Sequence, residues 1–180
     1  DWEGAYKAAS QVIDGGAYEI GGENELMGGM NSISYGNVMW GAGIETSEQS
    51  GAYAGFFTHM DNADGAYAKS APKLINKQLY NHIGSGEIRL RWWDPTDKES
   101  PYISKKFAFS NVQSWLGDYI YMRVEEMYFT AAEAALRLGN QDEARDLMNK
   151  VMAKRNPKYN AYNYSGTYLG ATTTTWTGSL

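Results

Sequence analysis

The chain of 180 residues carries 16 basic and 21 acidic side chains, a formal net charge of −5, and this balance argues against a nucleic-acid partner, which needs clustered lysine and arginine. The sequence has no cysteine, which excludes disulfides and cysteine zinc sites, and no apolar run approaches the length of a membrane span. Fourteen tyrosines and six tryptophans accompany 20 glycines, and aromatic rings with a polar atom, set among glycine-rich loops, favour a wet binding surface.

Residues 1–16 predict one amphipathic helix. Its apolar side chains recur at the three- and four-residue steps that place them on one face, and Gly15 with Gly16 ends it. We interpret this helix as the second member of a helical pair whose first helix precedes residue 1. Both ends of the chain are interpreted as cuts in a longer protein, so residues 1–180 are expected to form a single partial domain.

Residues 17–121 predict a long, loop-rich insertion that contains short strands. The apolar run within residues 37–45 favours a brief strand between glycine-rich loops. A helix is predicted near 71–83, where Ser70 would be the N-cap and Pro72 would lie near the first turn. The insertion therefore combines irregular backbone with one short helix.

The second half of this insertion predicts two further extended segments. Residues 88–93 alternate in the manner of a half-exposed strand, which would place Trp92 in the core and leave Trp93 exposed. Residues 101–121 supply another extended stretch that leads into the next helix.

Residues 122–157 predict a helical hairpin. Gly139 ends the first helix, Asp142 lies in the first turn of the second, and Pro157 prevents its continuation. Two antiparallel helices joined by a glycine-containing turn, with alanines at the close contacts, are typical of a tetratricopeptide unit. One such unit cannot bury its own apolar face, so neighbouring helices are expected. The fold is predicted to be mostly α, with an irregular tail over residues 158–180.

The hairpin resembles a segment typical of the SusD/RagB family of surface lipoproteins. In that segment the first helix carries Met-Arg, an acidic residue, Tyr and Ala-Glu-Ala, and the second is led by Ala and closed by Arg. The matching residues are Met122, Arg123, Glu126, Tyr128, Ala132, Glu133, Ala134, Gly139, Ala144, Asn149 and Arg155. Three weaker matches precede them in the family's order, at residues 5–20, 38–57 and 79–95.

The resemblance implies helical repeats (an α-α superhelix) that support a loop-rich, ligand-facing part. It also implies a non-enzymatic protein at the outer membrane and cell surface, held by a lipid on a cysteine that this chain lacks. Such a protein binds a glycan or another nutrient and delivers it to a SusC-like TonB-dependent transporter. We expect no cofactor and no bound metal.

Two other functions are compatible with the pattern. A tetratricopeptide-type scaffold would bind a protein partner in its groove. An all-helical glycoside hydrolase would need two facing carboxylates, for which Glu45 with Glu48 and Asp94 with Asp97 are available.

Candidate ligand-binding residues follow from the chemistry of sugars, which pair apolar ring faces with a rim of hydroxyl groups. Aromatic platforms on loops beside polar groups suit both features. We predict Tyr35, Tyr53, Tyr67 and Trp93 as platforms, with Arg91 as a polar partner. The aromatic residues assigned instead to the core are Trp2, Trp40, Phe56, Phe57, Trp115 and Tyr128.

Other polar residues are expected to have structural roles. Asn31, Asn37 and Asn62 could bind hydroxyl groups, but asparagine in glycine-rich turns usually bonds to nearby backbone. The H-x-D-x-x-D pattern at residues 59–64 matches no established metal-ligand spacing, and a solvated loop is expected there. The hairpin residues predicted to form surface pairs are Glu125, Glu126, Glu133 and Arg137.

Overall fold

The computed structural model describes residues 1–48, 55–163, 165–166 and 174–175. The α-helices are α1 (Trp2–Asp14), α2 (Glu23–Met27), α4 (Phe56–Met60), α5 (Ala66–Ser70), α6 (Lys77–His82), α7 (Val124–Arg137) and α8 (Gln141–Ala153). Short 3-10 helices are η1 (Thr46–Glu48), η2 (Ile88–Trp92) and η3 (Ala161–Asn163). The strands are β1 (Val38–Ala42), β2 (Trp93–Asp94), β3 (Ile103–Ser104), β4 (Tyr119–Arg123), β5 (Ser165–Gly166) and β6 (Thr174–Thr175). The predicted mostly helical fold is confirmed. Among the described residues, no helix combines the length and apolar character needed to cross a membrane.

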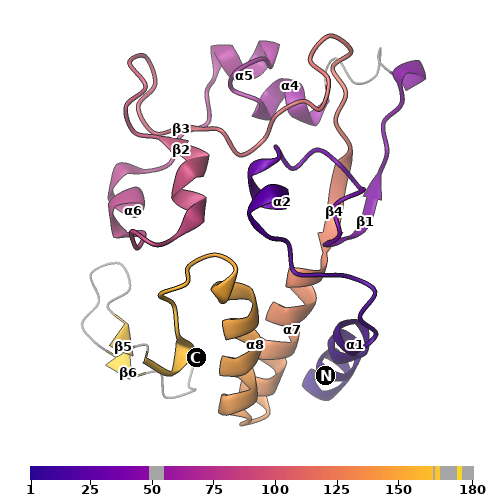
Figure 1. Cartoon of the computed structure of the whole chain (residues 1–180), viewed down its shortest axis with the longest axis vertical. Helices are drawn as coiled ribbons and strands as arrows, with labels where there is room; N and C mark the ends of the chain where they lie inside the picture. Colours follow the sequence, from indigo (N-terminus) through magenta and orange to yellow (C-terminus); the bar gives the residue numbers. More distant parts are fainter. Residues whose placement is uncertain (49–54, 164, 167–173, 176–180) are drawn as a thin grey trace.

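A layer of three helices forms one end of the molecule, with α7 between α1 and α8 (Figure 1). The helices α7 and α8 form the hairpin predicted over residues 122–157, and Gly139 takes the left-handed turn conformation at φ 88°. A buried cluster of Ala9, Ala131, Ala132 and Leu147 joins all three helices. Small alanine side chains let the helix axes approach closely, so α1 covers the face that the hairpin alone would expose.

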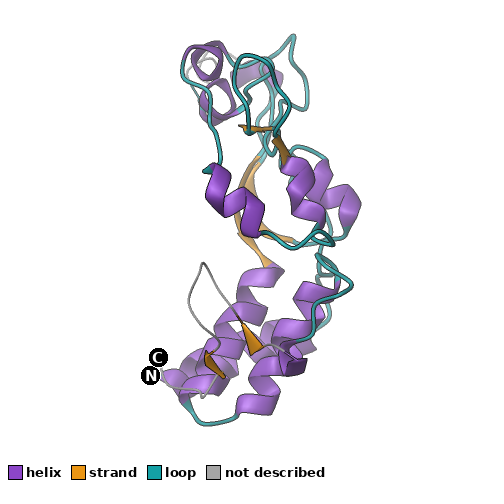
Figure 2. Ribbon diagram, turned by 90° about the vertical axis from the view of Figure 1, so that its left-hand side faces the viewer, coloured by secondary structure: helices purple, strands orange, loops and turns teal. Residues whose placement is uncertain are grey.

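The strand β4 connects this helical layer to the loop-rich part, because it continues directly into α7 (Figures 1 and 2). It pairs with β1 in an antiparallel ladder, which confirms the brief strand predicted within residues 37–45. At the end of the ladder the backbone N–H of Val124 donates to the carbonyl of Asn37, at 2.9 Å. The first turn of α7 is thereby fixed to the loop that precedes β1.

A buried ion pair strengthens this connection. Glu125 and Arg155 are 2% and 3% exposed, and Arg155 Nη2 lies 2.6 Å from Glu125 Oε1. Glu125 also accepts from Asn37 Nδ2 at 2.9 Å and from the backbone N–H of Gly21 at 3.1 Å, and Arg155 Nη1 donates to the Gly21 carbonyl. The prediction that Glu125 lies on the hairpin surface is therefore wrong. Its carboxylate instead joins α7, the end of α8 and two loops.

The helix predicted near 71–83 is shorter than expected. It begins at residue 77, and its N-cap is Asn76, whose Oδ1 accepts from two backbone N–H groups of the first turn. Residues 71–76 are extended, because Lys73 and Ile75 exchange backbone hydrogen bonds with residues 102–104. Ser70 ends α5 rather than capping a helix. Pairing with a segment distant in sequence therefore overrode the local helical pattern.

The strand predicted over residues 88–93 is wrong for residues 88–92, and only Trp93 belongs to a strand, β2. Residues 88–92 form the 3-10 helix η2, capped by Glu87, which accepts from the backbone N–H of Arg89 at 3.0 Å. Trp92 and Trp93 are both partly buried, so neither the core position of the first nor the exposed position of the second is correct. The indole N–H of Trp92 donates to the carbonyl of Leu26 at 2.7 Å, which anchors η2 on α2.

The close contact of β1 with β4 makes Gly41 a sensitive position. A Cβ at Gly41 would lie 2.5 Å from the Tyr119 carbonyl oxygen and 2.7 Å from Ile33 Cγ2. We expect Gly41→Ala to lower the free energy of unfolding by about 1–3 kcal/mol through overpacking. Gly36→Ala is the matched control, because a Cβ there meets no atom within 4 Å. Equal urea midpoints for the two variants of the intact protein would contradict this account of the ladder.

Candidate functional site

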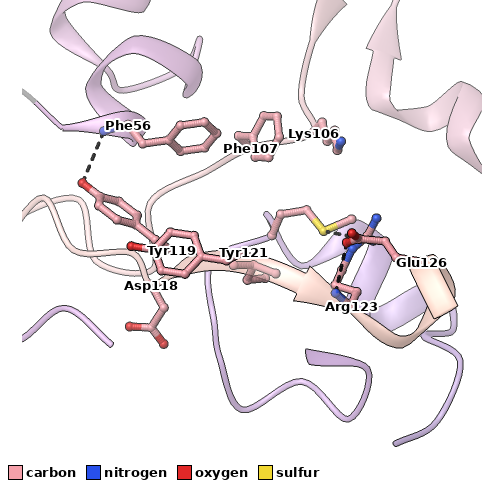
Figure 3. A pocket seen from close by; sticks show the side chains of 10 residues that line it. Phe56, Lys106, Phe107, Asp118, Tyr119, Tyr121, Arg123 and Glu126 are labelled. Atoms are coloured by element: carbon pink, nitrogen blue, oxygen red, sulfur yellow. Dashed lines mark hydrogen bonds between the residues drawn. The ribbon is translucent and has the colours of Figure 1, made fainter. Parts of the chain in front are cut away.

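A cleft of about 410 Å³ opens along β4, against α4 and the segment that follows β3. This volume falls within the range of small-molecule sites. Figure 3 shows aromatic rings along its walls and charged side chains toward its ends. Met30 and Ile120 complete the apolar lining.

The aromatic lining comes from three elements that are distant in sequence. Tyr119 and Tyr121 both come from β4, and both line the cleft. Phe56 from α4 contacts Phe107 edge to face, with ring centroids 5.0 Å apart. The backbone N–H of Phe56 donates to the Tyr119 hydroxyl at 3.3 Å, which joins the two walls (Figure 3). The rings therefore form a fixed apolar surface rather than independent side chains.

Trp40 on β1 extends this surface beside Tyr121. Their ring centroids are 5.1 Å apart, and the side chains are 63% and 51% exposed. The ladder is irregular here, because Trp40 pairs with Met122 while the next residue, Gly41, pairs with Ile120. Tyr121 is thus the unpaired residue of a β-bulge, a device that redirects side chains next to functional sites. The two exposed rings offer a platform at the cleft's edge.

Among the described residues, four charged side chains line the cleft, and their surroundings differ. Lys106 is partly buried, with Nζ 4.9 Å from the Trp92 ring centroid and 4.7 Å from that of Phe107. Burial lowers the pKa of Lys106, and the positive charges of Arg123 and Arg89 lower it further. These rings hold the ammonium group through cation–π contacts.

The two carboxylates of the cleft accept backbone hydrogen bonds. Asp118 accepts from the N–H groups of Ile33 at 2.9 Å and Ile44 at 3.0 Å, so it holds the loops on either side of β1. Glu126 accepts from the backbone N–H of Arg123 at 3.1 Å, in a capping box at the start of α7. Both groups therefore support the walls of the cleft.

Several aromatic residues assigned to the core are exposed. Phe57 is buried, at 3%, and Tyr128 packs against the helical core, as predicted. The large aromatics for which the core assignment is wrong are Trp2, Trp40, Phe56 and Trp115, all at least 37% exposed. Of these four residues, Phe56 lines the cleft, and Trp40 contacts the cleft residue Tyr121.

Tyr35 does not line the cleft. It is partly buried, and its hydroxyl lies 2.9 Å from the Gly28 carbonyl and 3.0 Å from Asn31 Oδ1. Burial raises the pKa of the Tyr35 phenol, and the negative charge of Glu25 contributes to the same shift. Its hydroxyl thus closes a loop. Tyr53, the other platform predicted nearby, lies outside the described residues.

The remaining predicted site residues are dispersed over the loop-rich part. Tyr67 is 44% exposed and stacks on His59, with centroids 4.6 Å apart. Arg91 forms an exposed ion pair with Glu23. Trp93 begins β2. Of the four predicted site residues that the structure describes, none lines the cleft.

The asparagines and the H-x-D-x-x-D pattern stabilise loops. Asn31, Asn37 and Asn62 each donate from the side chain to a segment distant in sequence. Asp61 is 2% exposed and accepts from the backbone N–H of Phe109 at 2.9 Å. Within the described part of the chain, no group of three or more acidic or histidine side chains could hold a metal ion.

Of the carboxylates considered for hydrolysis, those that the structure describes do not line the cleft. Asp94 forms an ion pair with Lys105 at 2.6 Å, and hydrogen bonds lower the pKa of Asp94, first from Lys105 and then from Thr96. Asp97 accepts from two backbone N–H groups of its own turn. The Glu48 side chain, which would pair with Glu45, lies outside the described part.

Part of the cleft has a signature in the sequence. In the segment Asp-Tyr-Ile-Tyr-Met-Arg, at residues 118–123, polar aromatic residues alternate with aliphatic ones and end in arginine. This period of two predicts that Tyr119, Tyr121 and Arg123 share one strand face. Trp40, Phe56 and Lys106 carry no comparable signal, since only the tertiary fold brings them to that face.

Comparison with known proteins identifies the family. The SusD family model matches residues 61–168, more than half of the chain. A SusD-like carbohydrate binding protein from Bacteroides vulgatus superposes with a TM-score of 0.72 at 24% identity, covering 86% of this chain and 33% of that chain. A SusD superfamily protein from Bacteroides thetaiotaomicron gives 0.61 at 18% identity, covering 90% and 40%. The chain thus spans two fifths or less of these solved proteins, and no curated protein matches it. It belongs to the SusD family.

Proposed function

We propose that the protein binds a glycan in the aromatic cleft, at the cell surface, and delivers it to a SusC-like TonB-dependent transporter. The observation that carries the binding role is the aromatic surface of Tyr119, Tyr121 and Trp40 beside charged groups. Flat rings cover the apolar face of a pyranose, and the charged rim can bond its hydroxyl groups. The similarity to the SusD-like carbohydrate binding protein from Bacteroides vulgatus supports the same role.

The proposed role is binding without catalysis. Hydrolysis would require one carboxyl group to protonate the glycosidic oxygen and a second to act as base or nucleophile. The carboxylates of the cleft, Asp118 and Glu126, accept hydrogen bonds from backbone N–H groups and hold its walls. These backbone hydrogen bonds suit a structural role for the two carboxylates better than proton transfer to a ligand.

Titration calorimetry of the intact protein against plant, host and microbial glycans tests this proposal. We expect saturable heat with at least one glycan, and an unchanged glycan profile by chromatography after prolonged incubation. Absence of heat with every glycan would contradict the binding role. Shortened products would contradict the non-enzymatic role.

The proposed transporter partner requires a separate experiment. Outer membranes of the source organism would be solubilised in mild detergent, and the tagged intact protein would be isolated with its partners. We expect a TonB-dependent transporter among the co-purified proteins, identified by mass spectrometry. The proposed lipid-anchored surface location predicts that protease added to whole cells degrades the protein. A protein recovered without any transporter, or protected in whole cells, would contradict these two parts of the proposal.

A further inference from the structure

Within the described part of the chain, two cations at one end of the cleft have no ion-pair partner. Among the described residues, the ion pairs involve other basic side chains, and neither Lys106 nor Arg123 lies within 4 Å of an acidic oxygen. The Arg123 guanidinium contacts the sulfur of Met30, at 3.9 Å, and the Lys106 ammonium lies over the rings of Trp92 and Phe107. Two partly buried charges thus lack the opposite charge that usually accompanies them.

The positive charges also lie near one another. The groups whose charge acts on Lys106 are Arg123 and Arg89, and both are cations. Arg89 is paired, because it makes two side-chain hydrogen bonds to Glu87, at 2.8 and 2.7 Å. Lys106 and Arg123 both line the cleft and carry the same charge, so an anion between them would reduce their repulsion.

Of the two described acidic residues that line the cleft, neither forms an ion pair with Lys106 or Arg123. Asp118 precedes β4 and Arg123 ends it, and five residues of extended strand span roughly 16 Å. Figure 3 shows Asp118 at the other end of the cleft, with its carboxylate directed away from Lys106. Glu126 lies beside Arg123, but its side chain is exposed and accepts from the Arg123 backbone N–H.

From this arrangement we infer that the cleft selects acidic glycans, in which a carboxylate or sulfate group lies between Lys106 and Arg123 while a pyranose ring rests on the Tyr119–Tyr121 surface. The inference rests on the proposed glycan-binding function and specifies its substrate class. Arginine can bind an oxyanion through two parallel N–H groups, and lysine adds a point charge. Partial desolvation by the aromatic walls strengthens both interactions relative to those of exposed side chains.

The test compares matched acidic and neutral ligands by calorimetry on the intact protein. The carboxylate probe is a galacturonic acid hexasaccharide, and its control is the same oligosaccharide after carboxyl reduction. The sulfate probe is a chondroitin sulfate oligosaccharide, with its desulfated form as control. We expect at least one acidic probe to bind about tenfold or more tightly than its neutral form, with affinity falling as salt rises.

Variants assign the preference to the two cations. Lys106→Gln and Arg123→Gln are each expected to weaken binding of the acidic probe by about tenfold or more, with little effect on the neutral form. Lys105→Gln is the matched control, because this neighbouring lysine pairs with Asp94 and does not line the cleft. Arg123→Lys keeps the positive charge, so we expect it to bind the acidic probe more tightly than Arg123→Gln does. This comparison distinguishes the loss of charge from a folding defect.

The outcomes separate the inference from the function on which it rests. Equal affinity for acidic and neutral forms, unchanged by Lys106→Gln, would overturn the acidic preference and leave glycan binding intact. Binding of no glycan at all would overturn both. If Lys105→Gln weakened binding of the acidic probe as much as Lys106→Gln did, the preference would come from general surface charge. That result would also overturn the inference.

Discussion

Changing Arg155 to methionine is expected to lower the free energy of unfolding by about 3–5 kcal/mol, because Glu125 would remain buried without its charge partner. Arg155 and Glu125 are both almost inaccessible to solvent. Burial lowers the pKa of Arg155, the charge of Glu125 opposes that shift, and the guanidinium stays protonated at neutral pH. The substitution would also release the Gly21 carbonyl from its donor.

Urea unfolding of the intact protein measures this effect. The matched control is Arg137→Met, which removes an exposed ion pair with Glu133 on the same hairpin and is expected to cost less than about 1 kcal/mol. The double variant Glu125→Gln with Arg155→Met leaves no buried charge, so it is expected to be more stable than Arg155→Met alone. A single Arg155→Met variant as stable as the control would contradict the role of the ion pair.

Changing Trp40 or Tyr121 to alanine is expected to weaken glycan binding by about ten- to thirtyfold each. The two rings contact each other and are more than half exposed, so a sugar would bury apolar surface that now faces water. Each substitution removes one side of the platform. Because the rings are so exposed, stability should change little, and urea unfolding checks this.

Two further aromatic substitutions provide the comparison. Phe129→Ala removes a ring that is 40% exposed on α7, outside the cleft, and is expected to leave affinity unchanged. Tyr67→Ala tests the platform predicted from sequence, which stacks on His59 away from the cleft lining. A loss confined to Tyr67→Ala would move the site to that surface and contradict the assignment to the β4 cleft.

The helical layer was predictable because its determinants are local. The three- and four-residue apolar period, the glycine at the turn and the proline after the second helix all act within a few residues. The local pattern wrongly predicted a helix at residues 71–76, because Lys73 and Ile75 form backbone hydrogen bonds with residues 102–104. Contacts distant in sequence also decide the position of Glu125. Its neighbours in sequence suggest a surface position, but hydrogen bonds with Arg155 and Asn37 hold it in a buried site.

The cleft was less accessible to sequence reasoning. The glycine-rich loops favoured Tyr35 and Tyr67 as platforms. However, the Tyr35 hydroxyl bonds to residues of its own loop, and Tyr67 stacks on a histidine. The platform instead comes from a strand and its bulge, where Tyr121 lies unpaired beside Trp40. Alternation along β4 could have indicated Tyr119 and Tyr121. The position of the partner strand could not be read from local pattern.

A crystal structure of the intact protein with a glycan that binds in calorimetry tests the central claim most directly. We predict a pyranose ring stacked on Tyr121 or Trp40, with its polar groups directed toward Lys106 and Arg123. A glycan bound elsewhere, with these four side chains untouched, would contradict the assignment of the aromatic cleft as the binding site.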